Sequence, residues 1–241
     1  MAHPSISIIT VVLNGENCLE QTIKSVLGQN YPAKEYVVID GGSTDGTLNI
    51  INKYASQLTQ WVSEPDRGIY DAMNKGVDLA SGDWLIFMNA GDEFFDEETL
   101  MKTARYLTDD VDLVYGDAWF YGTRGRLLTC DHLKMRVIHQ SLLYRKRLHE
   151  EVGRYLVGKG VTISDYIFFN ALAHRHWRRV EHVIAKCDDR GVSSRSWTLY
   201  QKLAVDLLFQ KRGRLGVAAL LILYPFYKVL KKSALWLTRA R

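Results

Sequence analysis

Amide and carboxylate side chains directly follow three of the apolar runs in this sequence. Asn14 follows the first run, Asp40 follows the second, and Asn89 and Asp92 follow the fourth. Carboxylate oxygens hold divalent cations, and a bound cation can act as a Lewis acid. In open α/β sheets, ligands bind outside the carboxyl ends of the strands, so the residues after each run are candidates for binding and chemistry.

The loop after the second run has two interpretations. It reads DGGSTDGT from Asp40 to Thr47. Ser, Thr and Asp cap helices and Gly permits tight turns, so this loop can be a plain turn that leads into a helix. It can equally be a ligand-binding loop, and the local pattern leaves both interpretations open. Asp45 is expected to be a structural residue of the turn.

Two further groups of polar residues lie in the second half of the chain. Asp165 follows Ser164 at the start of an apolar helix, where both side chains could cap free backbone amides. His139 and Gln140 precede an apolar strand at residues 142–144. A lone histidine in such a place is more often a hydrogen-bonded structural residue than a catalyst, so its role is left open at this stage.

Apolar runs rich in Val and Ile alternate with segments of helical period. This pattern is typical of a buried, mainly parallel sheet with crossover helices, and it predicts an α/β, Rossmann-like fold. The expected strands are residues 6–13, 36–39, 61–62, 84–88, 113–120 and 142–144, and the expected helices are residues 18–27, 44–54, 69–80 and 97–107. A hairpin is expected at residues 122–125.

Composition indicates an ordinary globular protein. The chain has 241 residues, of which 47% are apolar and four are proline, so it can bury a core. Cys18, Cys130 and Cys187 are far apart and lack metal-ligand spacing, so neither a disulfide framework nor a zinc site is expected. The first apolar run has no basic segment before it and leads into polar residues, unlike a secretory signal. We therefore expect the body of the protein in the cytoplasm.

Charge is divided unevenly along the chain. The last 47 residues, from Arg195, carry ten Lys and Arg residues and one acid, whereas the rest of the chain is net acidic. Leu215–Tyr227 is uncharged but shorter than the roughly 20 residues of a spanning helix. Its basic and aromatic flanks suit a segment that lies at a membrane surface, and the alternative is a helix packed on the body or on a second copy of the chain. We expect residues 195–241 to form a helical extension that associates with an anionic membrane surface.

Four motifs in one order resemble the inverting family 2 glycosyltransferases of GT-A fold. They are DGGSTDGT at 40–47, SEPDRGIYDAMNKG at 63–76, ASGD at 80–83 and NAGD at 89–92. The resemblance covers about residues 5–194, implies a catalytic domain at 1–194, and is closest to the branch found in bacterial colanic acid, capsule and O-antigen gene clusters. It implies a nucleotide-sugar donor, a divalent metal ion (Mn²⁺ or Mg²⁺) and a saccharide acceptor, commonly lipid-linked, in surface polysaccharide synthesis.

The resemblance also implies roles for individual residues. Asp92 matches the last Asp of the family's metal motif, and Asn89 is then an orienting or nucleotide-facing amide. Asp165 matches the general base that removes the acceptor's hydroxyl proton in an inverting transfer. The other implied contacts are with the donor, through Asn14, Asp40, Asp66 and Lys75, and with the acceptor, through His139 and Gln140.

Lys75 has an alternative interpretation. If residues 69–80 are helical, Asp71 and Lys75 are four residues apart and could simply form a surface ion pair. The donor contact and the surface pair are both kept open for Lys75.

Other classes of function are less well supported. The P-loop and the GxGxxG dinucleotide turn are missing, and the first strand is not followed by the Gly-rich loop of a nucleotidyltransferase. Nucleic acid is not an expected partner, because the basic residues of the tail interleave with a long apolar stretch. The serious rival is a non-catalytic nucleotide- or sugar-binding subunit, since the acidic motif is reduced. We expect a metal-dependent hexosyltransferase at the inner face of the cell membrane, and the sequence leaves its oligomeric state open.

Overall fold

The computed structural model of the chain describes residues 3–121, 125–188, 196–209 and 211. Contacts divide the chain into two units, residues 1–191 and 192–241, and each is described by itself. The strands of the first unit are β1 (Ile6–Val12), β2 (Lys34–Asp40), β3 (Gln60–Ser63), β4 (Trp84–Phe87), β5 (Glu93–Phe94), β6 (Leu113–Tyr121), β7 (Arg126–Leu128), β8 (Leu142–Arg145) and β9 (Trp177–Asp188). Its helices are α1 (Leu19–Leu27), α2 (Thr47–Tyr54), α3 (Ile69–Leu79), α4 (Thr99–Ala104), α5 (Leu148–Val152) and α6 (Ser164–Ala171).

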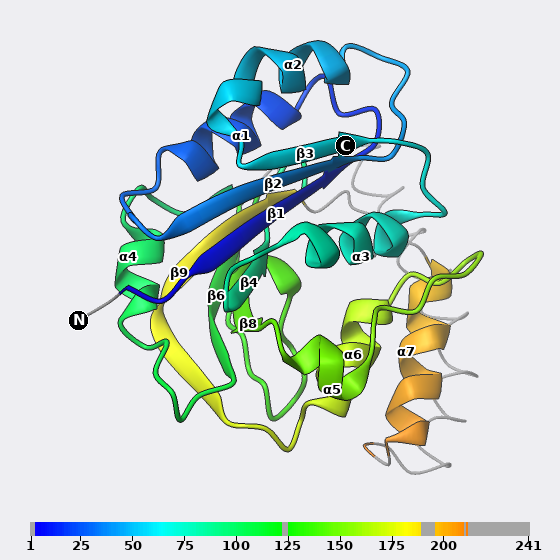
Figure 1. Cartoon of the computed structure of the whole chain (residues 1–241). Coiled ribbons are helices and arrows are strands. Elements are labelled where there is room, and N and C mark those ends of the chain that lie inside the picture. The colour runs from blue at the N-terminus through cyan, green and yellow to red at the C-terminus, as the bar shows by residue number, and fades with distance from the viewer. Residues whose placement is uncertain (1–2, 122–124, 189–195, 210, 212–241) are drawn as a thin grey trace, which may run out of the picture. The chain divides into compact units, whose positions relative to one another are not determined.

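One sheet runs through the first unit in the order β3-β2-β1-β4-β8-β6-β9-β5, with β7 paired to β6 (Figure 1). Strands β3, β2, β1 and β4 are parallel to one another. Strand β8 runs antiparallel to both β4 and β6, and β9 runs parallel to β6. The predicted α/β class is confirmed, with a parallel first half and a mixed second half. Because β1, β2 and β4 are parallel, their carboxyl ends meet at one edge of the sheet, and the loops that follow them lie together at that edge.

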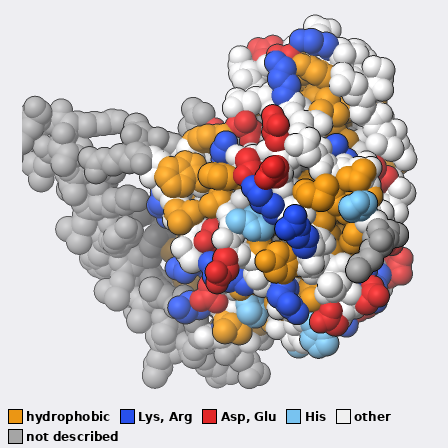
Figure 2. All heavy atoms as spheres, turned by 90° about the vertical axis from the view of Figure 1, so that its left-hand side faces the viewer, with side chains coloured by type: hydrophobic (Ala, Val, Ile, Leu, Met, Phe, Trp, Pro, Cys, Tyr) orange, Lys and Arg blue, Asp and Glu red, His pale blue; other side chains and the backbone are white. Residues whose placement is uncertain are grey.

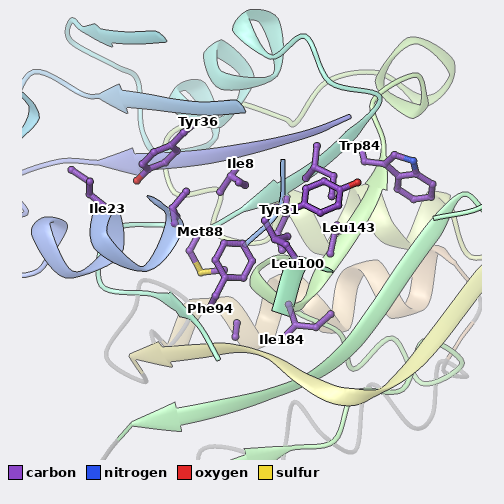
Figure 3. Close-up of a cluster of buried hydrophobic side chains, with 14 of the residues drawn as sticks. Ile8, Ile23, Tyr31, Tyr36, Trp84, Met88, Phe94, Leu100, Leu143 and Ile184 are labelled. Carbon is purple, nitrogen blue, oxygen red and sulfur yellow. The ribbon is translucent and has the colours of Figure 1, made fainter. Parts of the chain in front are cut away.

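Alternating side chains of the strands pack into two separate cores, one on each face of the sheet. In β1, Ile6 and Ile8 belong to the core under α1, α2 and α4, whereas Ile9 and Val11 belong to the core under α3, α5 and α6. Figure 3 shows part of the first of these cores. This period of two is the geometry of a strand, and burial on both faces explains why the strands read as continuous apolar runs.

Helix α2 begins three residues later than predicted. Its expected first residue, Thr44, instead donates its backbone N–H to the Oδ1 atom of Asn14, at 2.8 Å. Asp45 accepts a hydrogen bond from the backbone N–H of Thr47 at 3.0 Å, which ends the turn and starts the helix there. The structural role expected for Asp45 is therefore confirmed.

Strand β5 is an element that the sequence pattern does not predict. It contains two residues, Glu93 and Phe94, which pair antiparallel with Lys186 and Ala185 of β9. Helix α4 follows it and is shorter than expected. The segment after Asp92 is thus fixed by a strand from the far end of the unit, which no local periodicity could reveal.

Exposed charges of the first unit lie next to charges of opposite sign. Lys and Arg side chains alternate with Asp and Glu on the face shown in Figure 2. Examples of such pairs are Lys53 with Glu20 at 2.6 Å and Lys102 with Asp96 at 3.0 Å. Exposed pairs of this kind contribute about 0–1 kcal/mol each, so the two apolar cores carry most of the stability.

The second unit contains one described helix, α7 (Ser196–Leu208). None of the helices within the described residues is long and apolar enough to cross a membrane. The apolar segment Leu215–Tyr227, on which the membrane prediction depends, lies outside the described residues.

Packing of α3 on β1 generates a test of the fold. A Cβ atom on Gly76 would lie 2.4 Å from the Cγ2 atom of buried Ile9. Gly76→Ala gains about 1 kcal/mol of helix propensity, but overpacking costs about 1–3 kcal/mol, so we expect urea titration to show a lower free energy of unfolding. In an Ile9→Ala background the clash is gone, and the same substitution should be neutral or stabilising. Equal destabilisation in both backgrounds would contradict this packing.

Candidate active site

The loops after β1 and β2 are joined by hydrogen bonds. Asn14 donates its backbone N–H to the Oγ atom of Ser43 at 2.7 Å and accepts at Oδ1 from the backbone of Thr44 at 2.8 Å. Asn14 has a φ of 52°, a left-handed conformation that Asn tolerates better than most residues. The structure thus brings together the two loops that the sequence assigns to the donor.

Asp40 lies at the end of β2 and is fully buried. Its Oδ2 atom accepts hydrogen bonds from the Ser63 hydroxyl at 2.7 Å and from the backbone N–H groups of Ser43 and Gly42 at 3.1 and 3.2 Å. The turn interpretation of this loop therefore describes its local structure correctly. Asp40 also ties the loop after β2 to the end of β3, so it holds the shape of the predicted donor side.

Asp66 lies against the loop that follows Asp40. Its Oδ1 atom accepts from the backbone N–H of Gly68 at 2.8 Å. A Cβ atom on Gly41 would lie 2.1 Å from the Oδ2 atom of Asp66, so a larger residue there would displace this carboxylate. The carboxylate is half-buried and adjoins the predicted donor loops.

Lys75 does not pair with Asp71, which corrects the surface-pair interpretation. Asp71 instead pairs with Arg67 at 2.7 Å. Lys75 pairs with Glu64 at 2.9 Å and donates to the carbonyl of Pro65 at 3.0 Å. The ammonium group of Lys75 therefore contacts the loop after β3, at the two residues that precede Asp66. It does not lie along the surface of α3.

Asp165 is held from two sides by residues distant in sequence. The Tyr70 hydroxyl donates to Oδ1 at 2.7 Å, and Nδ1 of His139 lies 3.0 Å from Oδ2. A backbone hydrogen bond from Tyr166 also stabilises the Asp165 carboxylate at the start of α6, so the capping interpretation is compatible with these two contacts. Burial alone raises the pKa of this carboxyl, but the hydrogen bonds from His139 and Tyr70 outweigh it and hold the pKa below its usual range. Asp165 is therefore ionised at neutral pH, with 21% of its side chain exposed, and it can accept a proton.

Asp92 is buried, and it is contacted by Gln140, the residue that follows His139. Its Oδ2 atom accepts from the Gln140 amide at 2.9 Å. Burial raises the pKa of this carboxyl to about 6, although Gln140, His139 and the Cys187 thiol favour the ionised form. His139 and Gln140 lie on one 3-10 turn (His139–Ser141), which thereby links the candidate base to the candidate metal ligand.

Asn89 joins the same cluster through its amide. Its Nδ2 atom lies 2.9 Å from Nε2 of His139, and its Oδ1 atom is buried without a hydrogen-bond partner among the described residues. The predicted acceptor residues His139 and Gln140 thus direct their side chains to Asp165, Asn89 and Asp92. The sequence did not single out Tyr70, although it lies within one of the quoted motifs.

The donor set suits a cation that arrives with a diphosphate. Within the described ranges, no three His, Cys, Asp or Glu side chains are grouped so that they could hold a metal ion. Asp92 supplies one carboxylate, and the unpartnered oxygen of Asn89 lies in the same short loop. Mg²⁺ is commonly held by one or two carboxylates together with substrate phosphates, so these residues fit a metal completed by the substrate.

A separate cavity of about 520 Å³ lies between α1 and β5. Its lining includes Glu20, Lys24, Glu93 and Lys186, and none of the predicted site residues is among the lining residues. The predicted residues therefore form their own cluster at the ends of the parallel strands.

Several known proteins are similar to this chain in sequence. One is a PGL/p-HBAD biosynthesis glycosyltransferase of Mycobacterium bovis, 39% identical over an alignment of 165 residues that covers 64% of this chain and 64% of that protein. The match therefore spans less than two thirds of that relative. An uncharacterized glycosyltransferase of Mycobacterium tuberculosis is 29% identical over 206 residues, covering 79% of this chain and 78% of that protein.

Solved structures share the fold. Staphylococcus aureus TarS in complex with UDP-GlcNAc has a TM-score of 0.69 at 19% identity, covering 85% of this chain and 65% of that one. Mannosyltransferase PcManGT from Pyrobaculum calidifontis in complex with GDP-Man and Mn²⁺ has a TM-score of 0.68 at 18% identity, covering 89% and 66%. These similarities support the GT-A fold class. Residues 7–177 match the model described as Glycosyl transferase family 2, and the chain belongs to that family.

Proposed function

We propose that the protein is an inverting glycosyltransferase that moves a sugar from a nucleotide-sugar donor to a saccharide hydroxyl. The observation that carries this proposal is the Asp165 carboxylate, which is ionised, partly exposed and oriented by Tyr70 and His139. Inversion needs a base that takes the acceptor's proton as its oxygen attacks the anomeric carbon. Asp165 has the charge and the accessibility for that step, and family membership supports the reaction class.

The donor side consists of the loops after the parallel strands. Asn14 and Asp40 shape one wall, Asp66 adjoins it, and Lys75 supplies a cation that could reach a diphosphate by leaving Glu64. Neighbours of the same fold were solved with UDP, UDP-GlcNAc and GDP-Man. We assign the nucleotide to this wall, with Asn89 as an orienting or nucleotide-facing amide.

Asp92 is the residue that would hold a divalent cation, Mn²⁺ or Mg²⁺, through its carboxylate. When bound, the cation neutralises charge on the departing diphosphate. Gln140 orients Asp92 by its amide hydrogen bond. One neighbour of the same fold was solved with Mn²⁺ and GDP-Man, which supports this assignment.

We further propose a lipid-linked acceptor at the inner face of the cell membrane, in bacterial surface polysaccharide synthesis. The support is the basic and apolar composition of residues 195–241 and the biosynthetic glycosyltransferase among the relatives. Basic side chains near the surface gain from anionic lipid headgroups, while aromatic and aliphatic groups insert. His139 adjoins the acceptor side through the base that it orients, and Gln140 is its neighbour on the same turn.

Replacement of the base separates catalysis from binding. Asp165→Asn keeps the shape of the side chain but cannot take a proton, so we expect transfer to fall at least ~10²-fold with near-normal donor affinity. Steady-state transfer and calorimetric donor binding measure the two effects. Asp109→Asn, at an exposed carboxylate, is the matched control and should change neither.

Two results would contradict the base assignment. Substantial transfer by Asp165→Asn would remove this residue from the mechanism. Loss of thermal stability together with donor binding would show a structural role instead. If the wild-type protein binds a panel of nucleotide sugars but neither transfers nor hydrolyses them, the non-catalytic subunit becomes the better account.

Asp92→Asn should raise the stability of the protein at pH 7 and weaken donor binding. In the folded protein the pKa of Asp92 is raised from 3.8 to about 6. The protonated carboxyl therefore adds to the free energy of unfolding below pH 4, and this contribution is lost as the pH rises through 6. The variant should therefore be more stable than wild type at pH 7, by up to about 3 kcal/mol, and of equal stability near pH 4. Calorimetry should show weaker Mn²⁺-dependent donor binding. Donor binding at the original affinity, with the original metal dependence, would exclude Asp92 as the ligand.

Deletion after Gly213 tests the membrane assignment. The truncated protein should lose sedimentation with phosphatidylglycerol vesicles, because the apolar segment and six of the flanking and later basic residues are removed. Nucleotide binding should persist, since the donor loops belong to the other unit. Vesicles of phosphatidylcholine alone are the control for charge. Unchanged sedimentation of the truncated protein would overturn the assignment.

A further inference from the structure

Asn74 on α3 pairs with the backbone of Tyr155, which lies in the chain between α5 and α6. The Asn74 amide donates from Nδ2 to the carbonyl of Tyr155 at 2.9 Å, and its Oδ1 atom accepts from the Tyr155 backbone N–H at 3.0 Å. An amide side chain has one donor end and one acceptor end, so Asn74 binds both backbone groups of one residue, as a neighbouring strand would. We call this pair of hydrogen bonds the Asn74 clamp.

The clamp lies one helical turn from the hydroxyl that contacts the candidate base. Tyr70 and Asn74 are four residues apart on α3 and therefore share one face of that helix. Tyr70 donates to Asp165 at 2.7 Å, whereas Asn74 binds Tyr155, earlier in the chain. One face of α3 thus holds two points of the segment that leads into α6.

The loop between these two points is closed by a further hydrogen bond. The backbone N–H of Leu156, which follows Tyr155, donates to the Oγ atom of Ser164. Ser164 is the first residue of α6 and directly precedes Asp165. The clamp fixes the start of the loop, and the closing hydrogen bond transmits this placement to the residue before Asp165.

Tyr155 is also anchored by its side chain. The residue is 2% exposed, and its hydroxyl lies 2.9 Å from the hydroxyl of Tyr144 on β8. Its ring centroid lies 5.9 Å from that of Tyr70 and 5.2 Å from that of Phe168. Tyr155 therefore contacts both α3 and α6, which pack over the same face of the sheet (Figure 1).

We propose that Asn74 is a positioning residue for the Asp165 carboxylate, acting through the clamp and the closed loop. The inference rests on the proposed function, in which Asp165 is the base. Proton transfer needs the two heavy atoms within hydrogen-bond reach, and a misplacement of about 1 Å can cost about 10²-fold in rate. Release of Tyr155 from the clamp should let the loop and the start of α6 shift, so that Asp165 moves away from the Tyr70 hydroxyl.

A purely structural role for Asn74 is the alternative, and it predicts different measurements. Loss of the amide leaves the N–H and the carbonyl of Tyr155 without partners, which by itself lowers stability. A loss of stability alone would leave kcat unchanged at temperatures below the unfolding transition. A positioning role lowers kcat in the folded protein, and it does so only while Asp165 is present.

Kinetics of the full-length Asn74→Ala protein test the inference. We expect kcat for transfer to fall about 10- to 100-fold with calorimetric donor affinity unchanged, because the predicted donor loops are joined by their own hydrogen bonds. Val77→Ala is the matched control, since Val77 is 1% exposed on the same helix and belongs to the same core. It should lower the melting temperature and leave kcat unchanged.

Asn74→Asp keeps the inference testable if Asn74→Ala does not fold. The carboxylate fills the same space and can still accept from the Tyr155 N–H, but it turns an oxygen toward the Tyr155 carbonyl in place of a donor. We therefore expect kcat to fall in this variant too, again with unchanged donor affinity. A folded Asn74→Asp or Asn74→Ala protein with the kcat of the wild type would overturn the inference.

A double-variant cycle with Asp165→Asn separates positioning from other effects. When the base is absent its placement no longer matters, so Asn74→Ala should cause no further loss of single-turnover transfer in the Asp165→Asn background. Equal fractional loss in both backgrounds would overturn the inference and leave the base assignment intact. Full transfer by Asp165→Asn alone would instead reject the base assignment, and the inference with it.

Discussion

Two hydrogen bonds to one carboxylate connect the parts of this site. Tyr70 reaches Asp165 from α3, and His139 reaches it from the turn before β8. A buried carboxylate without such donors would take up a proton, and it could then no longer act as a base. The placement of α3, α6 and β8 around one apolar core is therefore what keeps Asp165 ionised.

The 3-10 turn that carries His139 also contacts the loop after β4. Gln140 contacts Asp92 while His139 contacts Asn89, so two consecutive residues bind both polar members of the loop after β4. The loops after β1 and β2 are joined separately, through Asn14 and Ser43. The loops after β1, β2 and β4 all leave the parallel strands at the same edge of the sheet, and His139 links the last of them to Asp165 on α6.

Most of the fold and part of the site could be predicted from the sequence. Buried strands appear as Val- and Ile-rich runs because both faces of the sheet are covered. Strand β5 could not be predicted, because its two residues depend on pairing with distant β9. Tyr70 looks like any core residue of an amphipathic helix, and only the tertiary structure shows its hydroxyl at Asp165. The partner of Lys75 was also unpredictable, since Glu64 lies in a loop with no helical spacing to it.

The anomeric configuration of the sugar product distinguishes a single displacement, with Asp165 as base, from a double displacement. In the proposed reaction Asp165 activates the acceptor in a single displacement, so an α-linked nucleotide sugar should give a β-configured product, whether the acceptor is a saccharide or water. Proton NMR of the first product formed, recorded before mutarotation, distinguishes the anomers by their coupling constants. A β product is the predicted result. An α product would contradict an inverting mechanism with Asp165 as its base.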